Sequence, residues 1–239
     1  MFNWIEEAKK LNIDLSAEQI EQFDRYEALI LEWNHHKINL TAVTDPIEIR
    51  RRHFLDSLTC MAVLGSPEQP MKRLIDVGTG GGFPGLPLKI VYPSWPITLV
   101  DSVTKKTNFL QLVVDELGLS DVTVVSDRAE TIGQKKSYRE RFDWAVARSV
   151  AEMRILAEYL LPLVRVGGRV LAQKGENAPQ EIEGAYKAIS LLGGEMKNVR
   201  EVQLAGHVYK HHLVVLDKVA TTPAKYPRQP GKPRKRPLG

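Results

Sequence analysis

A glycine-rich segment that directly follows an apolar run restricts the fold of this chain more than any other feature. The run Leu74–Val77 leads into residues 78–85, which read Gly-Thr-Gly-Gly-Gly-Phe-Pro-Gly, and an apolar helical pattern follows. A strand, a tight turn and a helix in this order need glycine where the chain turns sharply or where a ligand approaches the backbone. The free N–H groups at the start of the helix favour a polar or anionic ligand group. The segment therefore predicts an α/β fold with a ligand site at the turn.

The chain after residue 70 alternates between short apolar runs and amphipathic stretches. Helices are expected at about 84–92, 104–117, 152–163 and 178–192. This alternation is typical of a parallel sheet covered by helices on both faces. Two strand-like segments close the pattern, which gives a mostly parallel sheet of seven strands. The expected strands are Arg73–Val77, Ile97–Val100, Val122–Val125, Phe142–Ala147, Gly168–Ala172, Met196–Leu204 and His212–Val219.

The first 65 residues carry only helical signals. Ser16 and Gln19 have the spacing of a capping box and predict a helix over 16–40. Asp45 and Pro46 suit the cap and the first position of a second helix that reaches about residue 64. A Gly- and Pro-containing turn is expected at 65–70. The expected organisation is a helical N-terminal extension (1–65), an α/β domain (66–220) and a basic Pro-rich tail (221–239).

Basic residues are concentrated at the C-terminal end. Of the formal net charge of +4, residues 221–239 contribute +6 with no acid, which leaves −2 for residues 1–220. A cationic tail favours an anionic polymer such as RNA, although a solubilising tail has the same composition. Its proline content predicts an extended or disordered chain in isolation.

The glycine spacing fits two classes of cofactor-binding proteins. Gly80, Gly82 and Gly85 match the G-x-G-x-x-G pattern of dinucleotide-binding folds. Asp76, Gly78, Gly80 and Gly82 match the form found in S-adenosylmethionine-dependent methyltransferases. There the acid orients the loop and helps to hold the ammonium group of the methionine moiety. Because S-adenosylmethionine has no pyrophosphate, an acid directed at the loop suits it better than a dinucleotide.

Asp101 follows the next predicted strand, 19 residues after Gly82. At this distance an acid accepts hydrogen bonds from the ribose hydroxyls of a bound nucleoside. Both cofactor classes carry that ribose, so Asp101 predicts nucleoside binding without choosing between them. The same residue can also cap the helix that follows.

Motifs typical of one family occur along nearly the whole chain. They are Asn39-Leu40-Thr41, His53-Phe54-Leu55-Asp56-Ser57-Leu58, the loop Asp76–Pro87, Asp101-Ser102 with Lys105, Arg148-Ser149-Val150-Ala151, and Tyr226-Pro227-Arg228. With them the chain resembles the bacterial 16S ribosomal RNA guanine-N7 methyltransferases, the RsmG or glucose-inhibited division protein B family. The resemblance implies a Rossmann-like class I methyltransferase fold. It also implies methyl transfer from S-adenosylmethionine to N7 of a guanine in the 530 loop of 16S ribosomal RNA.

The resemblance further implies a cofactor site. Ala129 and Glu130 would border the adenine, and Arg148 would lie at the cofactor or between the cofactor and RNA. The expected cofactor-binding residues are Asp76, Gly78, Gly80, Gly82, Phe83, Asp101, Ala129, Glu130 and Arg148.

RNA contacts are expected from cationic side chains, which bind phosphates without reading sequence. A run of three arginines beside His53 fits this role, and a solvated helix face is the less favoured alternative. The family places further basic residues near the site. The expected RNA-binding residues are Arg50, Arg51, Arg52, His53, Arg128, Lys174, Arg228, Lys232, Arg234, Lys235 and Arg236.

The predicted reaction requires the protein mainly to align the two reactants. Guanine N7 has an in-plane lone pair and no proton, so no general base is expected, and alignment of the reactants supplies most of the rate. Arg148 and Lys174 are the candidates near the reacting atoms. The place after the fourth strand reads Ala147-Arg148-Ser149 rather than the Asn-Pro-Pro-Tyr of exocyclic-amine methyltransferases. Cys60 lies far from that loop, which argues against a cysteine nucleophile.

Other functions explain less of the sequence. A small-molecule methyltransferase or a nicotinamide-dependent oxidoreductase accounts for the loop but not for the basic residues. A noncatalytic ribosome-assembly factor would bind RNA without using the loop. The histidines lack the spacing of metal ligands, so no metal is expected. No run of about 18 apolar residues predicts a membrane segment. The expected partner is 16S ribosomal RNA or the 30S particle, with a cytoplasmic monomer as the default.

Overall fold

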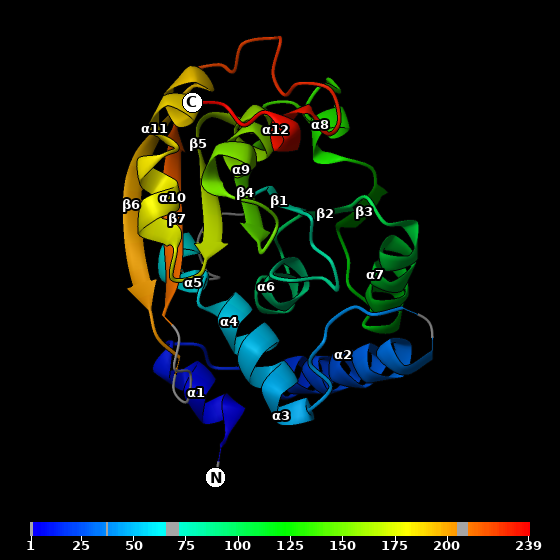
Figure 1. The fold of residues 1–239 in the computed structure, drawn as a ribbon. Coiled ribbons are helices and arrows are strands. Elements are labelled where there is room, and N and C mark those ends of the chain that lie inside the picture. Colours follow the sequence, from blue (N-terminus) through cyan, green and yellow to red (C-terminus); the bar gives the residue numbers. More distant parts are fainter. Residues whose placement is uncertain (1, 37, 66–71, 205–209) are drawn as a thin grey trace.

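The central element of the computed structural model is a seven-stranded sheet in the order β3-β2-β1-β4-β5-β7-β6 (Figure 1). Strands β1 to β5 are parallel, and β7 pairs antiparallel with β5 and β6. The model describes residues 2–36, 38–65, 72–204 and 210–239. The strands are β1 (Leu74–Val77), β2 (Ile97–Asp101), β3 (Val122–Ser126), β4 (Phe142–Arg148), β5 (Val164–Lys174), β6 (Gly194–Val202) and β7 (His211–Lys218). The predicted mostly parallel, seven-stranded α/β sheet is confirmed.

Helices cover both faces of this sheet because alternate strand residues point to opposite sides. In β1, Leu74 belongs to one hydrophobic core, whereas Ile75 and Val77 belong to the other. The first core includes α2 (Ala17–His36), α6 (Gly85–Val91) and α7 (Thr104–Glu116). The second includes α8 (Ala129–Ile132), α9 (Met153–Leu160), the 3-10 turn η2 (Leu161–Leu163), α10 (Ala178–Glu183) and α11 (Tyr186–Leu191).

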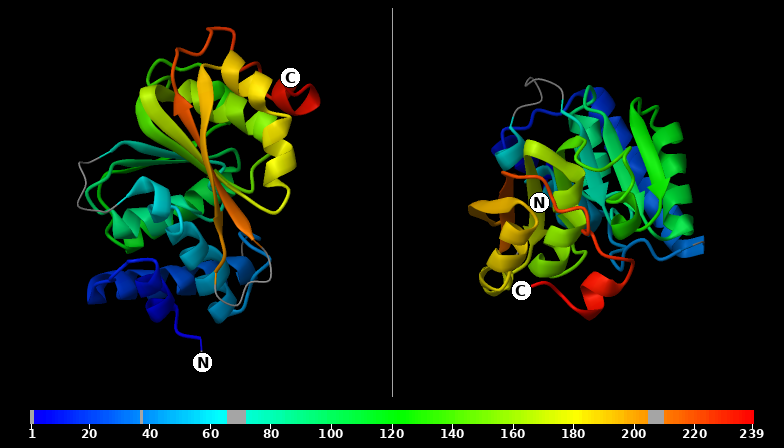
Figure 2. Two further views of the ribbon diagram at one scale, coloured as in Figure 1. Left: turned by 90° about the vertical axis from the view of Figure 1, so that its left-hand side faces the viewer. Right: turned by 90° about the horizontal axis from the view of Figure 1, so that it is seen from above.

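The N-terminal extension begins with α1 (Trp4–Lys10) and α2 and lies below the sheet in Figure 1 and in the left view of Figure 2. The predicted capping box at the start of α2 is present. The Gln19 N–H donates to Ser16 Oγ at 3.2 Å, and the Ser16 N–H donates to Gln19 Oε1 at 3.0 Å. Helix α2 ends before the predicted residue 40 because Asn34 Oδ1 accepts the Leu40 N–H at 2.7 Å, which turns the chain.

The second predicted helix, over residues 45–64, forms as a series of helical segments with a π-helical turn. Asp45 caps it through Oδ1, which accepts the Glu48 N–H at 2.9 Å, and Pro46 occupies the first position as predicted. The segments are α3 (Pro46–Ile49), the π-helical turn η1 (Arg50–Leu55), α4 (Asp56–Leu58) and α5 (Met61–Leu64). Single π turns inside helices are frequent at functional sites.

Aromatic side chains connect the N-terminal extension to the glycine loop. Ring centroids lie 5.1 Å apart for Trp4 and Phe23, 5.0 Å for Phe23 and Phe54, and 5.3 Å for Phe54 and Tyr26. Tyr26 then stacks on Phe83 of the loop at 5.7 Å. Through this chain of rings, the extension shares one hydrophobic core with the sheet and fixes the position of the loop.

The C-terminal tail packs against the α/β domain and forms the short helix α12 (Lys232–Lys235) beside α9, and the chain then runs to the region of α11 (Figure 1, Figure 2). Tyr226 is buried, and Arg228 binds the carboxylate of Glu158, whose side chain is fully buried. The extended or disordered conformation expected in isolation is therefore not the conformation in the folded chain, because the buried carboxylate requires a cationic partner.

Smaller differences concern element boundaries. The helix predicted over 178–192 consists of α10 and α11, with Gly184 as the C-cap of α10. Strand β5 starts at Val164, four residues earlier than predicted. The turn predicted at 65–70 falls almost wholly on residues 66–71, which lie outside the described residues.

Candidate active site

The glycine loop lies between β1 and α6 at the carboxyl edge of the sheet. Gly78, Gly80 and Gly82 have φ of +72°, +62° and +106°, which L side chains rarely adopt. A Cβ atom at Gly82 would lie 2.5 Å from Tyr26 Oη, and one at Gly78 would lie 2.7 Å from Val150 Cγ2. A Cβ atom at Gly80 would meet nothing within 4 Å. Close packing therefore requires glycine at 78 and 82, whereas Gly80 faces open space.

Asp76 is fully buried beneath this loop. Its Oδ2 accepts hydrogen bonds from Thr79 Oγ1 at 2.6 Å and from the Gly85 N–H at 2.8 Å. Burial raises the pKa of Asp76 to about 7, and these two hydrogen bonds oppose the shift. Asp76 lines neither of the two cavities described below. Its contacts fit the expected role of orienting the loop, and contact with a methionine ammonium group stays a prediction.

Asp101 connects the glycine loop to the next strand. Its Oδ2 accepts the Gly80 N–H at 2.9 Å, and its Oδ1 accepts the Val103 N–H at 2.9 Å just before α7. The second contact is a turn before the helix and not the expected cap, because the N-cap residue of α7 is Val103, which has no side-chain cap hydrogen bond. Each carboxylate oxygen retains a further lone pair for a hydroxyl donor.

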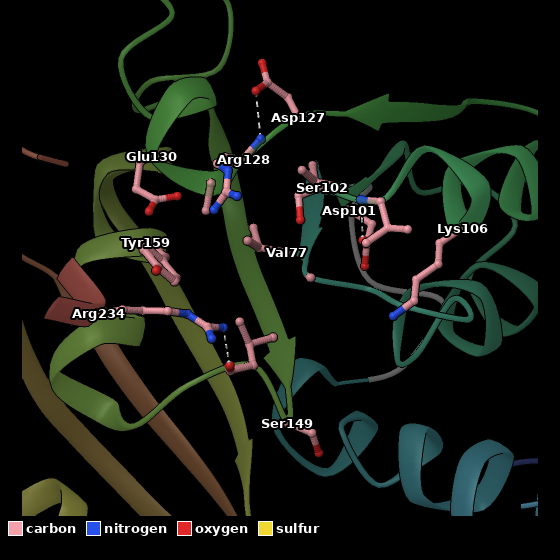
Figure 3. Close-up of a pocket in the computed structure, with 15 residues that line it drawn as sticks. Val77, Asp101, Ser102, Lys106, Asp127, Arg128, Glu130, Ser149, Tyr159 and Arg234 are labelled. Carbon is pink, nitrogen blue, oxygen red and sulfur yellow. Dashed lines mark hydrogen bonds between the residues drawn. The ribbon is translucent and has the colours of Figure 1, made fainter. Parts of the chain in front are cut away.

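A cavity of 380 Å³, the strand-end cavity, opens at the carboxyl ends of β1 to β4 (Figure 3). The strand order reverses between β1 and β4, which is where open α/β sheets bind ligands. Six predicted residues line this cavity: Gly78, Asp101, Arg128, Ala129, Glu130 and Arg234. With the apolar Val77 and Val100 between these polar groups, the cavity fits a nucleoside in size and chemistry.

A second cavity of 410 Å³, the arginine pocket, lies on the other side of the glycine loop. It shares Gly78, Lys106 and Ser149 with the strand-end cavity, so the two are adjacent. Its wall contains the predicted residues Gly80, Phe83, Arg52, His53, Arg148 and Lys174. Residues from the N-terminal extension, the loop and the ends of β4 and β5 thus meet around one cationic space.

Arg148, at the end of β4, is held by several acceptors at once. Its Nη1 donates to Asp56 Oδ2 at 2.7 Å and to the Arg52 carbonyl at 3.0 Å. Its Nη2 lies 3.2 Å from His53 Nδ1, and the guanidinium carbon lies 4.9 Å from the centre of the Phe83 ring. Asp56 and Arg148 are both largely buried, at 5% and 13% exposure of their side chains. The π-helical turn therefore supplies most of the groups that orient Arg148.

His53 occupies the space between Phe83 and Arg148. Its ring stacks on Phe83 with centroids 4.6 Å apart, and Nε2 lies 2.6 Å from Thr41 Oγ1. Burial and the nearby positive charge of Arg148 lower the pKa of His53 to about 4. The imidazole is therefore neutral near pH 7, and its Nδ1 lies within hydrogen-bond distance of both the Arg148 guanidinium at 3.2 Å and the Arg52 carbonyl at 3.1 Å.

The basic residues expected to bind RNA are divided by the structure. Arg52, His53 and Lys174 line the arginine pocket, where Lys174 donates to the Ala151 carbonyl at 2.8 Å and pairs with Glu181 at 2.5 Å. Arg128 instead lines the strand-end cavity.

Three other predicted arginines form ion pairs away from the pocket. Arg50 pairs with Glu27 at 2.6 Å, and Arg51 pairs with Glu48. Neither lines the strand-end cavity or the arginine pocket, because successive positions of the helical turn point in different directions. Arg228 is bound to Glu158. Of the remaining tail residues, Lys232, Lys235 and Arg236 are exposed, and Arg234 lines the strand-end cavity.

Asp56, Lys106 and Tyr159 are site residues that the sequence analysis did not select. Asp56 lies within the motif 53–58, so its position was visible, but its pairing with Arg148 spans 92 residues of sequence. The sequence motif after the second strand included Lys105 and not its neighbour Lys106. Tyr159 lies in the apolar pattern of α9 and gave no separate signal.

In the described parts of the chain, no helix combines the length and hydropathy needed to cross a bilayer. Over the same residues, no group of three or more His, Cys, Asp or Glu side chains is placed to hold a metal ion.

The parallel sheet with an antiparallel β7, the glycine loop after β1 and the carboxylate at the end of β2 define a class I methyltransferase fold. The family model described as GidB, rRNA small subunit methyltransferase G, matches residues 19–214. The chain therefore belongs to the ribosomal RNA small subunit methyltransferase G family.

Individual relatives agree with this assignment. Ribosomal RNA small subunit methyltransferase G of Roseiflexus castenholzii is 50% identical over 231 residues, which cover 97% of each chain. The protein of the same name from Desulforamulus reducens is 43% identical over 231 residues, 97% of this chain and 95% of its own length. Among solved structures, a 16S rRNA (adenine(1408)-N(1))-methyltransferase mutant from Catenulisporales acidiphilia superposes with a TM-score of 0.51. It is 18% identical and covers 64% of this chain and 87% of its own, a likeness of fold.

Proposed function

We propose that this protein transfers the methyl group of S-adenosylmethionine to N7 of a guanine in the 530 loop of 16S ribosomal RNA. One observation carries the proposal beyond family membership. A cavity suited to a nucleoside and a cationic pocket suited to RNA adjoin at the glycine loop, where they share Gly78, Lys106 and Ser149. Such continuity is what transfer between two bound molecules requires, because the reacting atoms must be held close together.

The strand-end cavity would hold the cofactor. Asp101 would accept the ribose hydroxyls with its remaining lone pairs, and Ala129 and Glu130 would border the adenine. The methionine part would reach past Gly78, which lines both cavities, to Gly80 in the adjoining arginine pocket, where a Cβ atom would project into open space. When bound, S-adenosylmethionine supplies the methyl group as an activated sulfonium substituent.

The arginine pocket would receive the target guanine. Lys174, Lys106 and Arg52 would contact the RNA backbone around it, and Arg148 would orient the base or its phosphate. Guanine N7 carries no proton, so this pocket needs no general base. The contacts agree with that requirement, because Asp56 is bound to Arg148 and a pKa of about 4 makes the imidazole of His53 a weak base.

The 30S particle or an assembly precursor of it is the substrate that we propose, since the 530 loop is folded within that particle. The proposed activity requires no metal, places the enzyme in the cytoplasm with the ribosomes, and needs only one copy of the chain. Each of these points is an expectation from the proposed reaction.

Methyl transfer to a defined position tests the proposal. The protein is incubated with tritiated S-adenosylmethionine and 30S particles from cells that lack the modification, and the RNA is then cleaved by borohydride and aniline, which act at 7-methylguanosine. We expect incorporation and cleavage at one guanine of the 530 loop. Incorporation without cleavage would retain the methyltransferase and remove N7 as the acceptor.

An Arg148→Ala variant provides the matched control. It should bind 30S particles nearly as well as the wild type but should transfer methyl groups at least about tenfold more slowly. Wild-type protein that binds the particles without transferring any label would support a noncatalytic assembly factor instead.

A further inference from the structure

The C-terminal tail forms part of the wall of the strand-end cavity. Arg234, on α12, lines the cavity and donates from Nη2 to the Val150 carbonyl at 3.1 Å (Figure 3). Val150 belongs to the segment after β4 that also lines the cavity and packs against Gly78 of the glycine loop. The side chain of Arg234 therefore reaches from the tail to the backbone next to the loop.

A hydrogen bond connects the tail to Glu130. The Gly231 N–H donates to Glu130 Oε1 at 2.9 Å. Tyr159 lines the same cavity and interacts electrostatically with both Glu130 and Arg234. In Figure 3 these three labelled residues, Glu130, Tyr159 and Arg234, lie together on the side of the cavity opposite Asp101 and Lys106. The tail thus binds the side chain of Glu130, a residue that is only 4% exposed.

Contacts just before α12 hold the tail firmly in this position. Arg228 binds Glu158 through its backbone N–H, Nε and Nη2, at 2.7, 2.9 and 2.6 Å. Arg139 donates to the Tyr226 carbonyl at 2.7 Å and to the Thr222 carbonyl at 2.6 Å. A Cβ atom at Gly133 would lie 2.6 Å from Pro227, which shows how closely the tail packs against α8. These contacts fix the position of α12 beside the cavity.

We propose that the tail segment 231–234 belongs to the cofactor site, with Arg234 and the Gly231–Glu130 contact closing the adenosine end of the strand-end cavity. This inference rests on the proposed function, because it assigns the cavity to S-adenosylmethionine. It changes the role of Arg234 from an RNA contact to a cofactor contact. Lys232, Lys235 and Arg236 remain exposed and available to RNA.

Cofactor affinity of tail variants tests the assignment. The chain truncated after residue 230 keeps the Arg228–Glu158 pair, so its fold should survive, and a thermal melt verifies this. Isothermal titration with S-adenosylmethionine and with S-adenosylhomocysteine should show a Kd raised by about tenfold or more in the truncated chain, because Glu130 loses a charge-assisted hydrogen bond. Arg234→Ala should raise the Kd by about threefold to tenfold, and it remains informative if the truncated chain is unstable.

Lys225→Ala is the matched control, since it removes one exposed positive charge from the tail outside the cavity. Its Kd for S-adenosylmethionine should equal that of the wild type. Unchanged cofactor affinity in both the truncated chain and Arg234→Ala, with weaker binding to a 16S RNA fragment, would overturn the inference in favour of an RNA arm. Failure of the wild type to bind S-adenosylmethionine would instead overturn the proposed function.

Discussion

Arg148 shows how the site depends on single side chains. Its guanidinium has no freedom to rotate while Asp56, the Arg52 carbonyl and His53 all surround it. Asp56 contributes the only negative charge among these three groups. Asp56 is therefore a positioning residue that would act on the reaction through Arg148.

Asp56→Asn tests this role with little change of shape. We expect kcat for methyl transfer to fall about tenfold to a hundredfold, because a misplaced group in the pocket costs that much. The free energy of unfolding should fall by about 1–3 kcal/mol. The Kd for S-adenosylmethionine should change little, since Arg148 does not line the strand-end cavity. Asp14→Asn, at an exposed position, is the control. Equal losses in kcat and cofactor affinity would contradict a role limited to Arg148.

His53 makes stability depend on pH in a defined direction. Its pKa in the folded chain is lowered from 6.5 to about 4, so the unfolded chain binds more protons between these values. The stability contribution is present above about pH 6.5 and is lost as the pH falls towards 4. The loss should be about 2 kcal/mol after allowance for partial exposure.

Urea unfolding of the wild type and of His53→Gln at pH 7, 5.5 and 4.5 measures this contribution. The difference in unfolding free energy between the two proteins should shrink as the pH falls. A difference that is constant across this range would show that His53 titrates normally in the folded chain.

At the scale of an element, the glycine loop combines two kinds of requirement. Packing requires glycine at position 82, because a Cβ atom there would collide with Tyr26. At position 80, only the φ of +62° favours glycine. The loop thus contains one position that serves the fold and one whose free side faces the open space of the site.

Gly80→Ala and Gly82→Ala separate these roles. Gly80→Ala should destabilise by only about 1 kcal/mol, the cost of a left-handed alanine, but should weaken binding of S-adenosylmethionine. Gly82→Ala should destabilise by about 3 kcal/mol or more, because the collision adds to the backbone cost. Thermal melts and cofactor titration measure both effects. A Gly80 variant with wild-type cofactor affinity would place the ligand away from this face of the loop.

For the molecule as a whole, the C-terminal tail contributes to stability through a long-range charge pair. The side chain of Glu158 is fully buried in α9 and finds its cation 70 residues further on, in Arg228. A buried carboxylate without a partner is costly, so the pair fixes the tail to the domain.

Arg228→Ala should therefore lower the free energy of unfolding by about 3–5 kcal/mol, measured by denaturant titration. Lys235→Ala, which removes one charge from an exposed tail position, should cost no more than about 0.5 kcal/mol. Similar small losses for the two variants, combined with a drop in RNA affinity for Arg228→Ala, would return Arg228 to the RNA-binding residues.

The sequence by itself predicted the features that depend on neighbouring residues. Strand and helix periodicity, the capping box of Ser16 and Gln19, and the Asp45 cap were all correct because hydrogen bonds and sterics over a few residues determine them. The glycine spacing after β1 and the acid after β2 likewise located the strand-end cavity. Family resemblance added the residues after β3 and β4, which do line the two cavities.

The tertiary structure decided which charges are paired and which face the site. In the sequence, Arg50, Arg52, Arg228 and Arg234 are equivalent cations. Packing pairs Arg50 and Arg228 with carboxylates that are distant in sequence. It places Arg234 and Arg52, which also pairs with the neighbouring Glu48, in the walls of separate cavities. The partners of Arg50 and Arg228 lie 23 and 70 residues away in sequence. No local pattern encodes such distances, because a side chain's charge is the same in any position, and only the packed chain determines what lies within reach of it.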